Sequence, residues 1–123
     1  MNSISTHVLD TNLGIPAAGV PVSLEIQTKD GSWKSISQGL TDADGRISQL
    51  VPTHGFIEPG IEPRIEPGIY RITFDTSHYF RSIEVQALYP SISVVFEKRL
   101  EDSRHFHIPL LLSPNGYSTY RGS

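Results

Sequence analysis

Apolar side chains occupy every second position along several short segments of the chain, a period that predicts half-buried β-strands. The clearest segment covers residues 20–27, where four aliphatic side chains alternate with proline and polar residues. An Asp-Gly turn within residues 29–32 follows it and predicts a hairpin partner over residues 33–38. The first third of the chain is therefore expected to form antiparallel β-structure.

The alternation returns at residues 70–74, and residues 92–100 are again rich in β-branched and aromatic side chains. Between these two segments, the Asp-Thr-Ser sequence at residues 75–77 offers an N-cap for one short helix that ends near Ile83. A polar loop is expected at residues 101–104. Short strands at regular spacing, with at most one helix, predict an antiparallel β-sandwich.

Composition narrows the possible functions. The 123 residues contain no obvious linker, so residues 1–123 are expected to form a single domain. The chain has no cysteine, which excludes disulfides and thiolate chemistry, and a net charge of −3 without a basic run disfavours nucleic-acid binding. No apolar stretch approaches the ~20 residues of a membrane span. The first residues do not resemble a secretory signal, so a cytoplasmic location is expected, or a periplasmic one if a signal has been removed.

Residues 57–68 form a tandem repeat in which Ile-Glu-Pro recurs every four residues. Proline at this spacing is incompatible with a helix or an interior strand. An extended, polyproline-II-like surface loop is the favoured interpretation, and a functional role such as a lid is the weaker one.

The C-terminal segment holds most of the candidate chemistry. Ser-Pro-Asn-Gly at residues 113–116 predicts a tight turn, and a two-residue hairpin loop there would bring His107 opposite Gly122, beside the terminal carboxylate. His105 and His107 would point to the same face of their strand. Two imidazoles, a carboxylate and the side chains of residues 120–121 (Tyr-Arg) would then gather in a small volume.

Four ordered blocks of sequence, which together span nearly the whole chain, carry a resemblance to a known family. They are Ser-Thr-His-Val-Leu-Asp at residues 5–10, Thr-Asp-Ala-Asp-Gly-Arg at 41–46, Tyr-Arg-Ile-Thr-Phe-Asp-Thr at 70–76 with Tyr-Phe at 79–80 and Tyr-Pro at 89–90, and His-Phe-His-Ile-Pro-Leu-Leu-Leu-Ser-Pro at 105–114 with Ser-Thr-Tyr-Arg-Gly-Ser at 118–123. In these blocks the chain resembles the 5-hydroxyisourate hydrolases, the transthyretin-related proteins of urate breakdown. The Tyr-Arg-Gly-Ser ending is the most specific block, because hormone-carrying transthyretins lack it.

The resemblance implies an all-β, transthyretin-like antiparallel β-sandwich of two four-stranded sheets with one short helix. It implies catalytic roles for His7, Arg46 and His107, and a homotetramer with sites in clefts at the dimer–dimer interface. The substrate-binding residues are expected to be His105, Tyr120, Arg121, Gly122 and Ser123. The chain departs from the family pattern at Phe106 and Asn115, neither of which is a catalytic position.

The function implied is hydrolysis of 5-hydroxyisourate to 2-oxo-4-hydroxy-4-carboxy-5-ureidoimidazoline in urate catabolism, without a cofactor or metal. A neutral histidine can take a proton from the attacking water, and an arginine can bind the carbonyl oxygen as it becomes negative. Residue types alone do not tell which of His7 and His107 is the base.

Two alternatives remain open. One is a transthyretin-like carrier of small aromatic ligands that performs no turnover. The other is a zinc-dependent hydrolase, because His-x-His on a strand can supply two zinc ligands, with a third from His7, His54 or His78. The zinc reading is the weaker one, since neither a cysteine nor an ordered pair of carboxylates completes the ligand set.

Overall fold

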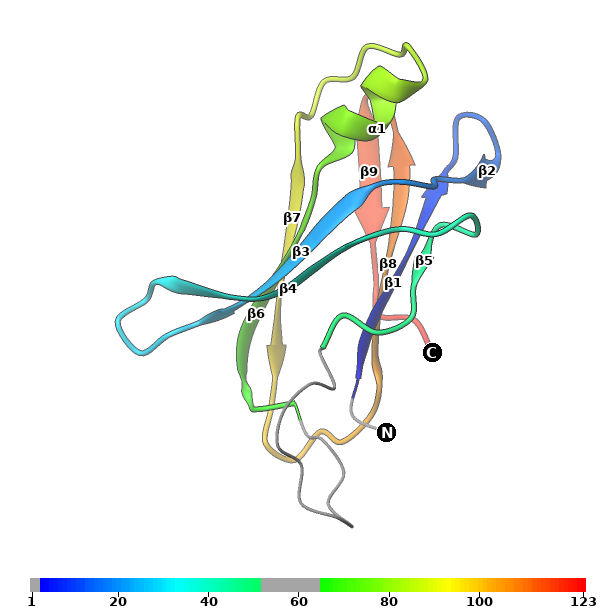
Figure 1. Ribbon diagram of the computed structural model, residues 1–123. Helices are drawn as coiled ribbons and strands as arrows, with labels where there is room; N and C mark the ends of the chain where they lie inside the picture. Colours follow the sequence, from blue (N-terminus) through cyan, green and yellow to red (C-terminus); the bar gives the residue numbers. More distant parts are fainter. Residues whose placement is uncertain (1–2, 52–64) are drawn as a thin grey trace.

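The computed structural model describes residues 3–51 and 65–123, which form two face-to-face β-sheets and one short helix (Figure 1). One sheet has four strands in the order β4-β3-β6-β7, and every neighbouring pair is antiparallel. Its strands are β3 (Pro21–Gln27), β4 (Trp33–Leu40), β6 (Gly68–Phe74) and β7 (Ile92–Lys98). The strands predicted at residues 20–27, 33–38 and 70–74 are thus confirmed, and the strand predicted at residues 92–100 is confirmed as far as Lys98.

The other sheet has five strands among the described residues. Three are β1 (Ile4–Asp10), β8 (Phe106–Ser113) and β9 (Gly116–Thr119), and two are the short segments β2 (Ile15–Pro16) and β5 (Arg46–Ile47). The sandwich is confirmed, but this sheet differs in detail from the predicted four antiparallel strands. Its central β1–β8 pair is parallel. The additional strand arises because the chain folds back twice onto the same edge of β1, and each return leaves a two-residue pairing.

The core lies between the sheets, and alternate residues of β1 and β8 point into it. Their even-numbered apolar residues face the other sheet, and residues from both sheets are at most 2% exposed: Ile4, Val8, Leu110, Leu112, Val22, Leu24, Ile72 and Phe74. Because successive side chains of a strand point to opposite faces, the odd-numbered residues of β1 and β8 face away from the core. His7, His105 and His107 are odd-numbered, so this outer face is where candidate chemistry collects.

Helix α1 (Thr76–Ser82) begins where the sequence predicts. Asp75 is the N-cap, and its carboxylate accepts hydrogen bonds from the His78 backbone N–H at 3.2 Å and the Ser77 hydroxyl at 3.0 Å. The Tyr79 hydroxyl donates to the buried Asp10 carboxylate at 2.7 Å, which attaches the helix to the end of β1. Burial first, and then this hydrogen bond, raise the pKa of Tyr79, so the phenol keeps its proton. No helix of the described residues is long and apolar enough to cross a membrane.

Most of the Ile-Glu-Pro repeat at residues 57–68 lies outside the described residues, so the predicted surface loop stays a prediction. Its last unit is described. Ile65 is buried in the core, and the Tyr70 hydroxyl donates to the Glu66 carbonyl at 2.5 Å. The end of the repeat is therefore attached to the sandwich where β6 begins.

Candidate active site

A cleft of about 380 Å³ opens on the outer face of the five-stranded sheet. Its lining comes from β1, from β5 and the residue after it, from the β8 region and from the end of the chain: Ser5, Thr6, His7, Arg46, Ile47, Ser48, His105, His107 and Ser123. The three residues predicted to be catalytic, His7, Arg46 and His107, thus lie in one cleft. Two of the five predicted substrate-binding residues, His105 and Ser123, line it as well.

A tight turn places Arg46 beside His7. The Asp42 carboxylate accepts hydrogen bonds from the backbone N–H groups of Asp44 and Arg46, both at 2.9 Å. Gly45 has a φ of +75°, and a Cβ there would collide with the Val8 carbonyl oxygen. The Gly45 carbonyl in turn accepts a 2.7 Å hydrogen bond from the Val8 N–H. The Asp-Gly-Arg sequence therefore fits this turn closely, and Arg46 pairs with His7 across the β1–β5 ladder.

The C-terminal hairpin adopts the predicted register. Leu110 pairs with Thr119 and Ser113 with Gly116, so the loop has two residues. An isolated bridge beyond the ladder pairs His107 with Gly122, whose N–H donates to the His107 carbonyl at 2.8 Å. After β9 the chain turns toward β5 (Figure 1), which brings Ser123 into the cleft.

Two serines connect the two histidines of His-x-His. The Ser5 hydroxyl oxygen lies 2.7 Å from both His105 Nε2 and His107 Nδ1, and the Ser3 hydroxyl is hydrogen-bonded to His105 Nδ1. Both serines are buried. Neither serine is among the site residues predicted from the sequence. Their spacing was a signal, because Ser5 and His7 alternate along β1 and Ser3 continues the same alternation one residue before the strand, so the three share its outer face.

His107 is arranged to be neutral near pH 7. Partial burial lowers its pKa below the usual 6.5, because removal from water disfavours the imidazolium ion. Positive charge on His105, His7 and Arg46 lowers the pKa further, in that order of effect. A neutral imidazole has one ring nitrogen free to accept a proton, so His107 is suited to be a base.

Within one chain, neither Tyr120 nor Arg121 lines this cleft, and their substrate-binding role stays a prediction. The Arg121 guanidinium donates to Asp102 Oδ2 at 2.8 Å and lies 4.1 Å from the centroid of the Phe106 ring. Tyr120 is 56% exposed. The hydrogen bonds of Arg104 and Arg121 hold the pKa of the Asp102 carboxyl well below its usual range. The ion pair with Asp102 holds the Arg121 side chain away from the cleft, whereas Gly122 and Ser123 stay beside His107.

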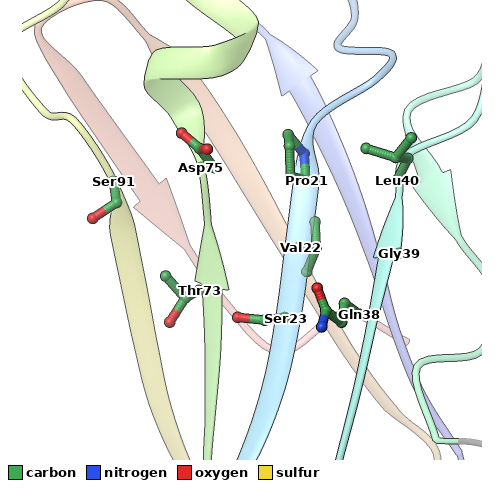
Figure 2. Close-up of a pocket in the computed structure, with 9 residues that line it drawn as sticks. All are labelled: Pro21, Val22, Ser23, Gln38, Gly39, Leu40, Thr73, Asp75 and Ser91. Carbon is green, nitrogen blue, oxygen red and sulfur yellow. The ribbon is translucent and has the colours of Figure 1, made fainter. Parts of the chain in front are cut away.

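A second depression, of about 460 Å³, lies on the outer face of the four-stranded sheet. Figure 2 shows that its side chains come from β3, β4 and β6, with Asp75 at the start of α1 and Ser91 just before β7. The Asp75 carboxylate already caps the helix, and the other polar groups of the depression are hydroxyls and one amide. It therefore offers no base comparable with the imidazoles of the histidine cleft.

Metal-ligating side chains do not cluster in the described part of the chain. No group of three or more histidine, cysteine, aspartate or glutamate residues there is arranged to hold a metal ion. Of the other candidate zinc ligands, His78 is exposed on α1 and does not line the cleft, and His54 lies outside the described residues.

The family model that describes the HIUase/Transthyretin family matches residues 4–122. The chain belongs to the HIUase/Transthyretin family. The 5-hydroxyisourate hydrolase of Salmonella typhimurium is 45% identical over 122 residues, which cover 99% of this chain and 82% of that protein. The 5-hydroxyisourate hydrolase of Klebsiella pneumoniae has a structure with a TM-score of 0.79 at 32% identity, and the match covers 100% of both chains. Transthyretin from Sparus aurata matches with a TM-score of 0.85 at 30% identity, over 99% of this chain and 97% of that one.

Both an enzyme and a transthyretin of the HIUase/Transthyretin family therefore share this fold with the chain. The backbone alone does not separate catalysis from transport, because one fold can carry different sites. Catalysis and transport must therefore be distinguished by the side chains that line the cleft.

Proposed function

We propose that the protein hydrolyses 5-hydroxyisourate to 2-oxo-4-hydroxy-4-carboxy-5-ureidoimidazoline, a step of urate catabolism. The observation that carries the proposal is the single cleft that holds His7, Arg46, His107 and Ser123. The relatives from Salmonella typhimurium and Klebsiella pneumoniae, both named 5-hydroxyisourate hydrolase, support it.

In the proposed mechanism, His107 takes a proton from water as the water oxygen attacks an amide-like carbonyl of the substrate. Arg46 donates hydrogen bonds to that carbonyl oxygen, and its fixed positive charge stabilises the negative charge that develops there. His7 faces the same space and orients the water or the substrate. A positioned base contributes typically ~10²–10⁴-fold to such a rate.

The carrier alternative fits the cleft less well. A channel for apolar ligands gains nothing from two imidazoles and a guanidinium, because each polar group that a ligand covers without a hydrogen bond costs free energy. A polar, oxygen-rich substrate satisfies the same groups. The cleft therefore favours the enzyme over a small-ligand carrier.

A direct assay tests the proposal. Urate oxidase converts urate to 5-hydroxyisourate in the cuvette, and the ultraviolet absorbance of that product is followed with and without the protein. Catalysis predicts a faster decay in proportion to protein concentration. Decay at the spontaneous rate, with tight binding of 5-hydroxyisourate or of aromatic ligands, would support the carrier instead.

Hydrolysis is expected to survive exhaustive treatment with a chelator, because three metal-ligating side chains do not cluster among the described residues. The measurement compares the initial rate before and after dialysis against EDTA, followed by addition of zinc. A rate that disappears with EDTA and returns with zinc would support a zinc-dependent hydrolase.

The acid limb of kcat/KM is expected to lie below pH 6.5. Only unprotonated His107 can accept a proton, and its pKa is lowered from 6.5, so the rate rises with pH and levels off at an acidic value. Replacing Arg46 with Gln removes a positive charge that disfavours the imidazolium ion, which raises the His107 pKa and moves the limb to higher pH. A limb centred above pH 6.5 in the unmodified protein would argue against His107 as the base.

We also propose that the active species is a homotetramer whose sites lie at the dimer–dimer interface, as the family resemblance implies. Tyr120 and Arg121 would then act across an interface instead of in their own cleft. Light scattering coupled to size exclusion is expected to give four times the chain mass of 13.6 kDa. Specific activity is expected to fall on dilution below the dissociation constant, and a fully active monomer would contradict this assembly. The cytoplasmic location stays a prediction.

A further inference from the structure

Four side chains form an unbroken hydrogen-bonded row, and three of them, Ser5, His105 and His107, line the cleft. The Ser3 hydroxyl is hydrogen-bonded to Nδ1 of His105. The Ser5 hydroxyl lies 2.7 Å from Nε2 of His105 and 2.7 Å from Nδ1 of His107. Nε2 of His107 takes no part in these bonds and is left for the reaction. Ser3 and Ser5 are only 7% and 6% exposed, so water does not readily replace their bonds.

The bonds of this row depend on one another. The Ser5 hydroxyl has one proton, so it donates to one imidazole and must accept from the other. A neutral imidazole carries one N–H. When Ser5 donates to His105, His107 must carry its proton on Nδ1, and its Nε2 is free to act as a base. When Ser5 donates to His107, the proton of His107 sits on Nε2, which is then an acid.

We propose that Ser5 and His105 are positioning residues that set the tautomer of His107 and hold its proton during the reaction. The inference rests on the proposed hydrolysis for its catalytic part, and on the hydrogen-bonded row alone for its tautomer part. In the resting protein Ser5 donates to His105, so His107 presents an unprotonated Nε2 to the cleft.

Each proton that moves in the proposed reaction has a donor and an acceptor along the row. As the water oxygen bonds to the substrate carbonyl carbon, one water proton moves to His107 Nε2. The Nδ1 proton of His107 passes to Ser5, and the original Ser5 proton passes to His105 Nε2. The positive charge is then on His105, and His107 is neutral with an N–H that faces the substrate. When the carbon–nitrogen bond breaks, that proton goes to the leaving nitrogen, and the row returns the stored proton to His107 Nδ1.

The placement of the two rings explains why a bridging hydroxyl is needed. Their centroids are 6.3 Å apart and their planes differ by 18°, while Ser5 pairs with His107 across the parallel β1–β8 ladder. The ladder thus places the Ser5 oxygen between the two rings. The other charged or titratable groups that line the cleft with His107 are His7, Arg46 and Ser123 at the end of the chain. Positive charge on His7 or Arg46 disfavours a lasting charge on His107, which supports its transfer to His105.

The test compares Ser5→Ala with Ser5→Thr, which keeps a hydroxyl, and with Ser93→Ala, which removes an exposed strand serine from the other sheet. Two-dimensional ¹H–¹⁵N spectra of the histidine rings, recorded without substrate, report which nitrogen of His107 carries the proton. Nδ1–H is expected in the unmodified protein, in Ser93→Ala and in Ser5→Thr, and a shift to Nε2–H is expected in Ser5→Ala. An unchanged His107 tautomer in Ser5→Ala overturns the proposal whether or not the protein hydrolyses 5-hydroxyisourate.

Kinetics test the catalytic part. Ser5→Ala and His105→Phe are each expected to lower kcat at least about tenfold with little change in KM, a share of the ~10²–10⁴-fold that a positioned base contributes. The double variant is expected to be no slower than the slower single variant, because both changes break the same row. The proposal would be overturned if the losses of kcat in the two single variants multiply fully in the double variant. It would also be overturned if the kcat of either single variant stays within twofold of that of the unmodified protein. If Ser5→Ala does not fold, the kcat of His105→Phe and the spectrum of His107 in that variant test the proposal instead. If the unmodified protein shows no hydrolysis, the proposed function fails while the tautomer result still stands.

Discussion

Replacing His7, Arg46 or His107 with alanine is expected to lower the turnover of 5-hydroxyisourate on the order of a hundredfold or more for each residue. Each change removes a group that takes a proton, orients the water or stabilises negative charge, and such groups are worth ~10²–10⁴-fold. Folding is expected to survive, because none of the three side chains belongs to the buried core. Steady-state kinetics with 5-hydroxyisourate, paired with circular dichroism, measure both effects.

His78→Ala and His54→Ala are the matched controls for these three variants. His78 is exposed on α1 and does not line the cleft, and His54 lies outside the described residues. Both variants are expected to hydrolyse the substrate at nearly the unmodified rate. If either control loses as much activity as His7→Ala or His107→Ala, the assignment of the catalytic histidines is wrong.

Much of the fold could be predicted because it depends on local rules. Alternation over residues 20–27 and 70–74 marks strands that bury one face, and a carboxylate at Asp75 caps the helix as its type predicts. The parallel pairing of β1 with β8 could not be predicted in this way. These strands are about a hundred residues apart, and neither carries a local signal for the direction of its partner.

The candidate site was predictable where one hairpin or one turn builds it. The loop at Pro114-Asn115 determines that Gly122 meets His107, and the Asp-Gly turn determines where Arg46 emerges. The alternation of Ser5 with His7 could be read from the sequence, but the contact of Ser5 with His107 depends on a non-local strand register that the sequence does not reveal. The ion pair of Arg121 could not be predicted for a related reason. Its partner Asp102 comes from a loop, whose position cannot be read from strand spacing.

The C-terminal segment also provides a large expected effect. Deleting residues 120–123 removes Ser123 from the cleft, the bridge between Gly122 and His107, and the ion pair of Arg121 with Asp102. The deletion is expected to abolish most hydrolysis of 5-hydroxyisourate, because His107 loses the backbone that fixes its position. Tyr120, Arg121 and Ser123 are exposed, so little core packing is lost. Circular dichroism and thermal melts are expected to show a folded protein.

A smaller change separates the effect on His107 from the loss of the whole segment. A Cβ at Gly122 would lie 2.5 Å from Cδ2 of the His107 ring, so Gly122→Ala must displace that ring. This variant is expected to lose most activity while keeping its stability. Ser93→Ala, which changes an exposed strand residue of the other sheet, is the matched control, and its activity is expected to stay near the unmodified level. A tag that extends the chain beyond Ser123 puts bulk into the cleft and is expected to inhibit like the deletion, whereas a ligand carrier would tolerate it. Equal hydrolysis by the deleted, extended and unmodified chains would show that this segment is no wall of the active site.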